Sequence, residues 1–223
     1  MQGVPLQFSD EKDRARFRHL EQLPGVELYH AHISRYAFEP HTHEAFGIGV
    51  IEQGAERFLY RGSQHIAAAN SIVTMNPDEL HTGEAETADG WRYRMIYLEP
   101  DRLEAITGVR DWWFSEVVRE DPLRSRLIGQ LIYGLWHSDD PLAQQGLLLD
   151  LIDAFRPLAH HASAQGEAGH RFDRVRDYLH DNYMRPITLD ELAQVAALSP
   201  YHFQRQFKAH YHVTPHQMLM AIR

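Results

Sequence analysis

The sequence predicts an α+β protein in which an N-terminal β-barrel with packed helices precedes a C-terminal all-α module. Three observations support this fold class. Short β-rich runs separated by Gly, Asn and Pro turns fill residues 26–100, which is typical of a barrel or double-sheet roll. Leucine-rich helical patterns fill residues 101–158. Two short helical patterns joined by a tight turn follow at residues 187–208.

The length and composition of the chain set the scale of its domains. With 223 residues, 43% of them hydrophobic, the chain can bury one sizeable core and a second, smaller one. It contains no cysteine, which excludes a disulfide framework and a thiolate metal site. No apolar run approaches the roughly 20 residues that span a bilayer, and the N-terminus lacks a signal-peptide core, so we expect a soluble cytoplasmic protein without a membrane partner.

The formal net charge of −9 is unevenly distributed along the chain. From Arg171 onward there are seven basic and five acidic residues, a balance of +2, so the preceding part carries −11. The C-terminal module is therefore mildly basic, and the six histidines from His170 onward add positive charge below neutral pH. This balance favours weak electrostatic attraction to nucleic acid.

Residues 1–25 are predicted to form an arm. The hydroxyl of Ser9 is placed to cap a short charged helix over residues 10–20, which Pro24 and Gly25 would end. We expect this arm to lie across the following domain; the alternative is a frayed terminus without a function.

Residues 26–100 are predicted to form the barrel, with strands at residues 27–38, 45–51, 56–61, 71–76 and 91–99. Alternation along the last strand places four large side chains on one face, namely Trp91, Tyr93, Met95 and Tyr97. Tyr93 is a candidate effector contact, because an aromatic lining with few polar groups is typical of ligand pockets, although such rings also simply pack barrels. Gly47 and Gly49 are expected to leave room for a small molecule.

Three histidines of the barrel are candidate ligand or metal contacts. His41 and His43 are separated by one residue and project to one face of a strand, and His81 follows a turn that can bring it alongside. Neutral imidazoles in this arrangement can bind Zn²⁺, Ni²⁺ or Fe²⁺, with Glu44 or water completing the shell. The alternative is that the imidazoles hydrogen-bond an effector, water or backbone. Glu44, also a candidate effector contact, would alternate to the opposite face from His43.

Residues 101–158 are predicted to be helical. Apolar residues recur every four positions from Leu123 to Leu135, and a second apolar pattern continues from Leu142 to Phe155. Two such helices exceed what one edge of the barrel needs; intramolecular packing is one use for them, and pairing of subunits in a homodimer is the use that the family resemblance described below implies. Residues 159–170 are small and polar and are predicted to be a linker, followed by a helix over residues 172–183 within a DNA-binding segment of residues 171–223.

Two helix starts lie within residues 187–208. Thr188 precedes a helix that begins near Leu189, and Glu191 stands three residues on to complete a capping box. Ser199 is placed to cap the second helix, and Pro200 occupies its first turn, where a missing amide hydrogen costs nothing.

The second helix presents a long, polar outer face, because Phe203 and Phe207 lie four residues apart and turn inward. Arg205 suits guanine and Gln204 suits adenine. Tyr201 suits a thymine methyl group or a phosphate, and Lys208 suits a phosphate. Short helices paired in this way dock in the major groove of DNA, and an ordinary helical hairpin is the alternative.

The ten residues SPYHFQRQFK at 199–208, with Leu192 and Ala193 before them and residues 213–215 after them, resemble the first helix-turn-helix of the AraC/XylS family of transcriptional regulators. The motif series between residues 41 and 83 resembles the cupin-like sensory domain that precedes this motif in many members, and the resemblance covers roughly residues 26–98. The resemblance implies a ligand-responsive regulator, not an enzyme, whose partners are DNA, a small-molecule effector, a second copy of the chain and RNA polymerase. The DNA-contact candidates are Thr188, Ser199, Pro200, Tyr201, Gln204, Arg205 and Lys208.

The chain departs from the family pattern at three positions that are often glycine, namely Asn70, Ala197 and His212. Residues other than glycine are uncommon at positive φ, so mild strain is expected at His212, whereas asparagine at position 70 tolerates left-handed backbone. The family's DNA-binding domain has two helix-turn-helix units joined by a long helix, and the sequence ends at Arg223 where that helix would begin. We therefore expect one reading unit and weak DNA binding.

Two other functions compete with this interpretation. The first is a metal-dependent cupin enzyme with a helical tail; against it, such enzymes usually place a carboxylate about four residues after the second histidine, where this chain has Gly47 and Ile48. The second is a truncated regulator that acts by forming mixed dimers with an intact one.

Overall fold

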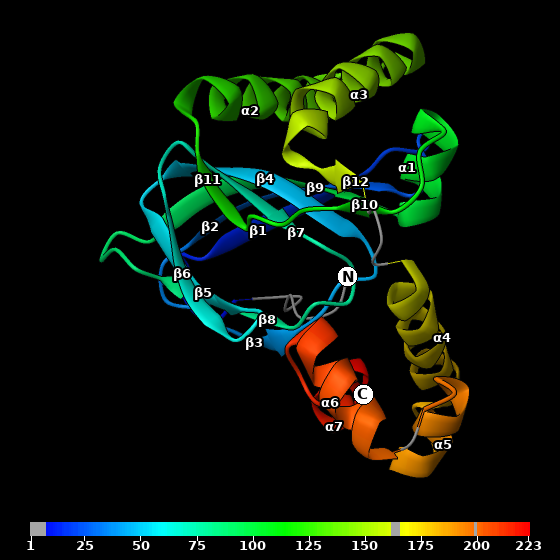
Figure 1. Ribbon diagram of the computed structural model, residues 1–223. Helices are drawn as coiled ribbons and strands as arrows, with labels where there is room; N and C mark the ends of the chain where they lie inside the picture. The colour runs from blue at the N-terminus through cyan, green and yellow to red at the C-terminus, as the bar shows by residue number, and fades with distance from the viewer. Residues whose placement is uncertain (1–7, 162–165, 199) are drawn as a thin grey trace.

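The computed structural model describes residues 8–161, 166–198 and 200–223, without the side chains of residues 161, 166–170, 201, 202 and 205. A six-stranded sheet faces a four-stranded sheet, and two long helices cover the outside of the larger sheet (Figure 1). A module of four helices lies beside β3 and β8 of the smaller sheet, on the side of the barrel away from the two long helices. This arrangement confirms the predicted α+β class with a barrel followed by an all-α module.

The larger sheet is antiparallel, and its strands lie in the order β1-β2-β9-β4-β7-β11. The strands are β1 (Arg14–His19), β2 (Val26–Ile33), β9 (Trp91–Leu98), β4 (Phe46–Gln53), β7 (Ser71–Met75) and β11 (Val118–Glu120). Leu28 opposite Ile96 faces the helices, whereas Tyr29 opposite Met95 faces the barrel interior. The sheet is thus buried on both sides, which accounts for the nearly continuous apolar run in β4.

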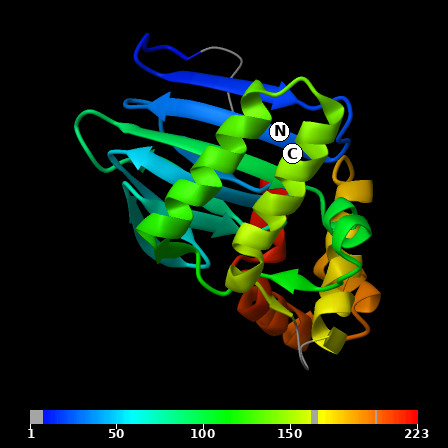
Figure 2. The same cartoon turned by 90° about the horizontal axis from the view of Figure 1, so that it is seen from above.

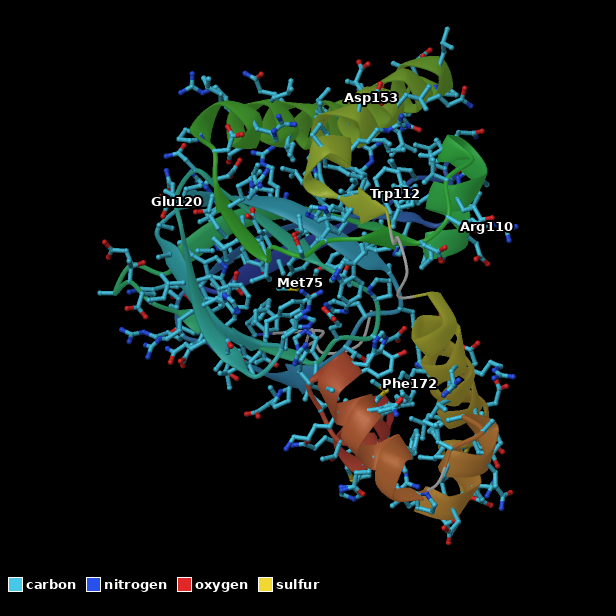
Figure 3. All side chains as sticks on the ribbon, viewed as in Figure 1. Met75, Arg110, Trp112, Glu120, Asp153 and Phe172 are labelled. Atoms are coloured by element: carbon cyan, nitrogen blue, oxygen red, sulfur yellow. The ribbon has the colours of Figure 1, made fainter. Side chains whose placement is uncertain are left out.

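The smaller sheet completes the barrel, with strand order β3-β8-β5-β6. Its strands are β3 (Phe38–His41), β8 (His81–Ala85), β5 (Ala55–Tyr60) and β6 (Ser63–Ala68), and a separate short pair joins β10 (Trp112–Trp113) to β12 (His160–His161). Phe58 and Tyr60 on β5 are buried against the inner face of the larger sheet. Met75 lies in the space between the two sheets (Figure 3).

Helices α2 (Pro122–His137) and α3 (Pro141–Phe155) run across the outer face of the larger sheet (Figure 2), with α1 (Pro100–Thr107) beside them and the 3-10 turn η1 (Arg156–Leu158) after them. Asp121 and Asp140 cap α2 and α3 by accepting hydrogen bonds from amides three residues on. The predicted apolar helices are confirmed, and their inner faces share one core with the sheet.

The C-terminal module consists of α4 (Gly166–Asn182), α5 (Leu189–Val195), α6 (Pro200–Tyr211) and α7 (Pro215–Ile222). Phe172 of α4 packs against Phe203 and Phe207 of α6, with ring centroids 6.3 and 5.8 Å apart (Figure 3). Leu80 of the barrel packs against the same core, so the module is docked on the barrel rather than separated from it.

The predicted N-terminal helix over residues 10–20 is wrong, because Arg14–His19 form strand β1 and pair with β2. The side chains alternate: Phe17 turns inward to Tyr29, with ring centroids 4.5 Å apart, while Arg14 and Arg16 are exposed. This two-residue period was present in the sequence but was outweighed by the capping signal at Ser9.

Other boundaries also differ from prediction. Strands β6 and β8 were not predicted, because their sequences contain Gly, Ala, Gln and Glu, which are poor strand formers. Helix α4 begins at Gly166 rather than at Phe172, so it takes up part of the predicted linker, while residues 162–165 of that linker lie outside the described residues.

Candidate effector cavity and DNA-reading helix

A cavity of about 40 Å³ lies inside the barrel, between the two sheets. Its polar lining includes His41, His43, His81, Tyr93, Tyr97 and Glu56. The structure therefore brings the three predicted histidines and Tyr93 to one cavity. By volume the cavity holds only about three waters, since each needs roughly 10–15 Å³.

The three imidazoles form a compact cluster. Each of His41, His43 and His81 has one ring nitrogen that lies within 4.8 Å of a ring nitrogen of both other histidines. His41 and His81 each place Nδ1 against a backbone carbonyl, of Glu39 at 2.7 Å and of Glu79 at 2.9 Å. A carbonyl only accepts, so both Nδ1 atoms carry the proton and both Nε2 atoms keep a free lone pair.

Burial keeps these imidazoles uncharged. It lowers the pKa of His41 and His43, and it lowers the pKa of His81 to about 3. The neighbouring imidazoles lower the pKa of His43 further by charge repulsion. The Nδ1 atom of His43 is buried and has no hydrogen-bond partner among the described residues. The cluster therefore offers neutral nitrogen donors.

Glu56 is a cavity residue that the sequence did not point out. It is 8% exposed, and burial raises the pKa of its carboxyl to about 8. The sequence signal that could have identified it is alternation along β5, which places Glu56 on the same inward face as Phe58 and Tyr60. A carboxylate at an inward-facing position of a barrel strand is unusual.

The expectation that Gly47 and Gly49 leave room for a ligand is wrong. A Cβ at Gly49 would lie 2.0 Å from Met95 Sδ and 2.2 Å from the Arg94 carbonyl oxygen, and one at Gly47 would lie 3.3 Å from Met95 and Tyr97 atoms. The glycines therefore allow β9 side chains to approach β4 closely, and these side chains fill the space.

Glu44 lies outside the barrel cavity, as the alternation after His43 indicated. Its carboxylate reaches His180 of α4, with Oε1 3.2 Å from Nδ1. Glu44 lines a second, larger cavity of about 790 Å³ between the barrel and α4, and His43 and Tyr97 line both cavities.

The helix-turn-helix has the predicted local structure. The Glu191 amide donates to the Thr188 hydroxyl at 3.2 Å, and the Thr188 amide donates to the Glu191 carboxylate at 3.0 Å, so the capping box is confirmed. Ala197 and His212 both have positive φ, of 53° and 59°, as expected at positions that favour glycine. Asn70 in the barrel has a φ of 71° for the same reason.

The outward face of α6 is exposed to solvent. Phe203 and Phe207 are fully buried, whereas Gln204 and Lys208 are exposed. Pro200 begins the helix. Ser199 lies outside the described residues, as do the side chains of Tyr201 and Arg205, so their predicted contacts depend on the sequence alone.

A sensory barrel joined to an exposed recognition helix defines a ligand-responsive, DNA-binding transcriptional regulator. The family model for the AraC-like ligand binding domain matches residues 23–152, and that for bacterial regulatory helix-turn-helix proteins of the AraC family matches residues 179–220. The chain belongs to the AraC family.

Curated relatives are similar over most of this chain. The uncharacterized transcriptional regulator YbfI of Bacillus subtilis is 25% identical over 87% of this chain and 76% of its own length. The transcriptional activator RhaS of Yersinia pestis is 23% identical over 84% of this chain and 72% of its own length. Both relatives carry the description of a regulator.

Solved structures support the fold alone. ToxT from Vibrio cholerae aligns with a TM-score of 0.56 at 7% identity, over 92% of this chain and 80% of that chain. In the part of the chain that the structure describes, no helix is long and apolar enough to cross a membrane.

Proposed function

We propose that the regulator senses its effector in the barrel cavity, with His41, His43, His81 and Tyr93 as contacts. The observation that carries this proposal is the cluster of three neutral imidazoles around a buried cavity. Glu44, which was predicted alongside them, contributes to the second cavity instead.

A divalent metal fits the cavity better than a larger molecule. The free Nε2 atoms of His41 and His81 are oriented by their Nδ1–H···O=C bonds, which is how metal-binding histidines are usually held. Three nitrogen donors suit Zn²⁺, Ni²⁺ or Fe²⁺, with water at any remaining position, since no carboxylate joins the cluster among the described residues. The volume of about 40 Å³ also favours an ion.

Metal binding is tested by dialysing the native chain against each ion and measuring bound metal and unfolding free energy. We expect bound metal and a gain of about 2.7 kcal/mol at a metal concentration of 100 times Kd. His81→Gln should lose both, and His216→Gln, which changes an exposed histidine of α7, should lose neither. Equal metal content in the native chain and His81→Gln would exclude the cluster as the site.

We also propose that α6 reads DNA in the major groove. Gln204 and Arg205 would contact bases and Lys208 a phosphate, with Tyr201 beside them. Pro200 at the start of α6 and Thr188 at the start of α5 lie at helix N-termini, which suit contacts to the phosphate backbone, and the sequence adds Ser199 as a further candidate contact. A single reading unit of this charge would bind weakly.

Fluorescence anisotropy on the chain's own upstream DNA and on a scrambled duplex, at two salt concentrations, tests this assignment. Arg205→Ala should cost about 1–3 kcal/mol on the specific DNA only, and Lys208→Ala should weaken binding to both duplexes and reduce the salt slope by about 1. Gln206→Ala, another exposed polar change on α6, is the control. Equal losses for Arg205→Ala on both duplexes would show that Arg205 is not a base contact.

Dimerisation, contact with RNA polymerase and a cytoplasmic location complete the proposal. Dimerisation would supply a second reading unit and raise DNA affinity by linking two weak contacts. The outer faces of α2 and α3 support it, because Leu123 and Leu142 are 81% and 77% exposed there. A metal-dependent enzyme remains the second candidate, supported by the histidine cluster, and it predicts turnover that the sensor does not require.

A further inference from the structure

One turn of the barrel touches both the histidine cavity and the helical module. This β7–β8 turn, residues 76–81, ends at His81, whose imidazole lines the cavity. Leu80 packs against the hydrophobic core of the module, and the Asp78 amide donates to the His43 carbonyl oxygen at 2.7 Å. Six residues therefore connect two of the three cavity histidines to the DNA-binding part of the chain.

Asp78 is the main polar contact between the turn and α4. Its carboxylate is buried, with 2% of the residue exposed, and it faces two basic side chains of α4. Oδ2 lies 3.2 Å from Nη1 of Arg176, and Oδ1 lies 3.4 Å from Nε2 of His180. Because both of these basic side chains belong to the module, the charge partners that Asp78 has among the described residues are present only while the module is docked.

His180 adds a second connection to the barrel. While Nε2 faces Asp78, Nδ1 lies 3.2 Å from Oε1 of Glu44. Both ring nitrogens thus face a carboxylate, and both contacts favour the positively charged imidazolium form. Glu44 follows directly after His43, so this contact too begins beside the cavity.

The same turn reaches α6 by a separate route. The Glu79 carboxylate accepts from Nε of Arg61 at 3.0 Å, and the Arg61 guanidinium lies 4.3 Å from the ring centroid of Trp113. Trp113 stacks on His210 near the end of α6, with an interplanar angle of 27°. Adjacent residues of one turn are therefore linked to both helices: Asp78 contacts α4 directly, and Glu79 is connected to α6 through Arg61 and Trp113.

We propose that the β7–β8 turn couples the histidine cavity to the helix-turn-helix module, and that Asp78 holds the module docked on the barrel. This inference rests on the proposed function, because an occupant of the cavity is what would move His81 and His43. An ion that draws these imidazoles together displaces the turn at His81 and at the Asp78 amide, which His43 holds, and so changes the position of the Asp78 carboxylate relative to α4. The module then changes its orientation without any contact between the ion and DNA.

Energy transfer between two dyes on the full chain measures docking directly. The chain has no native cysteine, so Leu59→Cys on the barrel and Met184→Cys on the module, both at exposed positions, label specifically. Asp78→Asn should lower the transfer efficiency, with the undocked fraction rising about tenfold or more, as when a buried charge partner is removed. Asp177→Asn is the matched control, because Asp177 pairs with the same arginine at 2.8 Å but lies on α4 itself.

Equal transfer in Asp78→Asn and Asp177→Asn would overturn the inference. If Asp78→Asn fails to fold, Glu44→Gln replaces it: this exposed change removes the other carboxylate at His180 and should also lower transfer, and unchanged transfer would again overturn the inference.

Addition of Zn²⁺ alone, with bound metal measured in parallel, tests the coupling itself. Transfer should change in the native chain, and it should not change in Asp78→Asn although Zn²⁺ still binds. Zn²⁺ that binds the native chain without changing transfer would overturn the coupling. Absence of Zn²⁺ binding would count against the proposed metal function alone, and the docking role of Asp78 would then be decided by the comparison with Asp177→Asn.

Discussion

His180 on α4 and Asp78 in the β7–β8 turn form an ion pair across the boundary between barrel and module, with Nε2 3.4 Å from Oδ1. The Asp78 carboxylate raises the pKa of His180, partial burial opposes this effect, and Glu44 raises the pKa further. The two parts of the chain are therefore held together in part by an imidazole whose pKa is raised above its ordinary value by the docked carboxylates.

Docking should weaken as the pH rises. His180 has a raised pKa when docked and an ordinary value of about 6.5 when released, so its contribution is complete below about 6.5 and is lost as the pH passes the raised value. The charged groups that act on it directly are Asp78, Glu44 and Arg176, and the cavity that it lines also carries Glu27, Glu99, Asp101, Asp177 and Asp181. Energy transfer between pH 5.5 and 9 checks this, and His180→Gln should remove the dependence. A native profile that matches His180→Gln would contradict it.

Glu56 should make the barrel less stable in mild base. Burial raises the pKa of Glu56 to about 8, so the folded chain keeps a proton that the unfolded chain releases above about 4.5. Stability therefore falls as the pH rises from about 4.5 to about 8. Urea unfolding should show Glu56→Gln more stable than the native chain by about 2–4 kcal/mol at pH 8.5 and equal to it at pH 4.5. Glu84→Gln, an exposed change on β8, should show no such difference.

Two glycine substitutions should have opposite effects. Gly49→Ala places a Cβ 2.2 Å from the Arg94 carbonyl oxygen, so β4 and β9 must separate, and we expect a loss of about 1–3 kcal/mol. Gly146→Ala in α3 places a Cβ with no atom within 4 Å apart from its chain neighbours and the backbone of its own helix, and it removes a poor helix former, so we expect a gain of about 0.5–1 kcal/mol. Thermal unfolding of both variants measures the difference; a stable Gly49→Ala would show that Met95 and β9 adjust freely.

The proposed dimer should depend on the outer face of α2. Leu123 and Leu127 are 81% and 47% exposed and line a groove between α2 and α3. Leu127→Glu should abolish association by placing a charge in an apolar contact, whereas Leu59→Glu, with 51% exposure on the smaller sheet, should not. Sedimentation equilibrium at micromolar concentration distinguishes them, and a monomeric native chain would remove the basis of the proposal.

The parts of the fold that were predictable are those where local signals and packing agree. The barrel strands with alternating aromatic or β-branched residues, the leucine-rich helices and the capping box at Thr188 and Glu191 all agreed in this way. Strand β1 was missed because it lies at the edge of the sheet, where its alternating arginines stay exposed. Arginines are equally common on the exposed face of a helix, so they did not mark this segment as a strand. Strand β8 was missed because pairing with β3 and β5, not propensity, stabilises it.

The candidate site was predictable where spacing or a turn signal marked its residues. The spacing of His41 and His43 indicated a shared face, and the turn before His81 indicated the third member. Asp78 carried no such signal, because Arg176 and His180, which balance its charge, lie about a hundred residues later on a helix of the other domain. The volume of the cavity also depends on how far Met95 fills it, which no sequence pattern encodes.

The pairing of Asp78 with two bases of α4 limits how the two halves of this protein can be exchanged with those of relatives. Consider a hybrid that joins this barrel to the DNA-binding half of another family member without basic side chains at positions 176 and 180. Such a hybrid would leave the buried Asp78 carboxylate without a charge partner. Each half would fold on its own core, but the hybrid would no longer respond to its signal. To transfer DNA specificity from one family member to another, residues 76–81 and the first helix of the DNA-binding half must therefore be exchanged together.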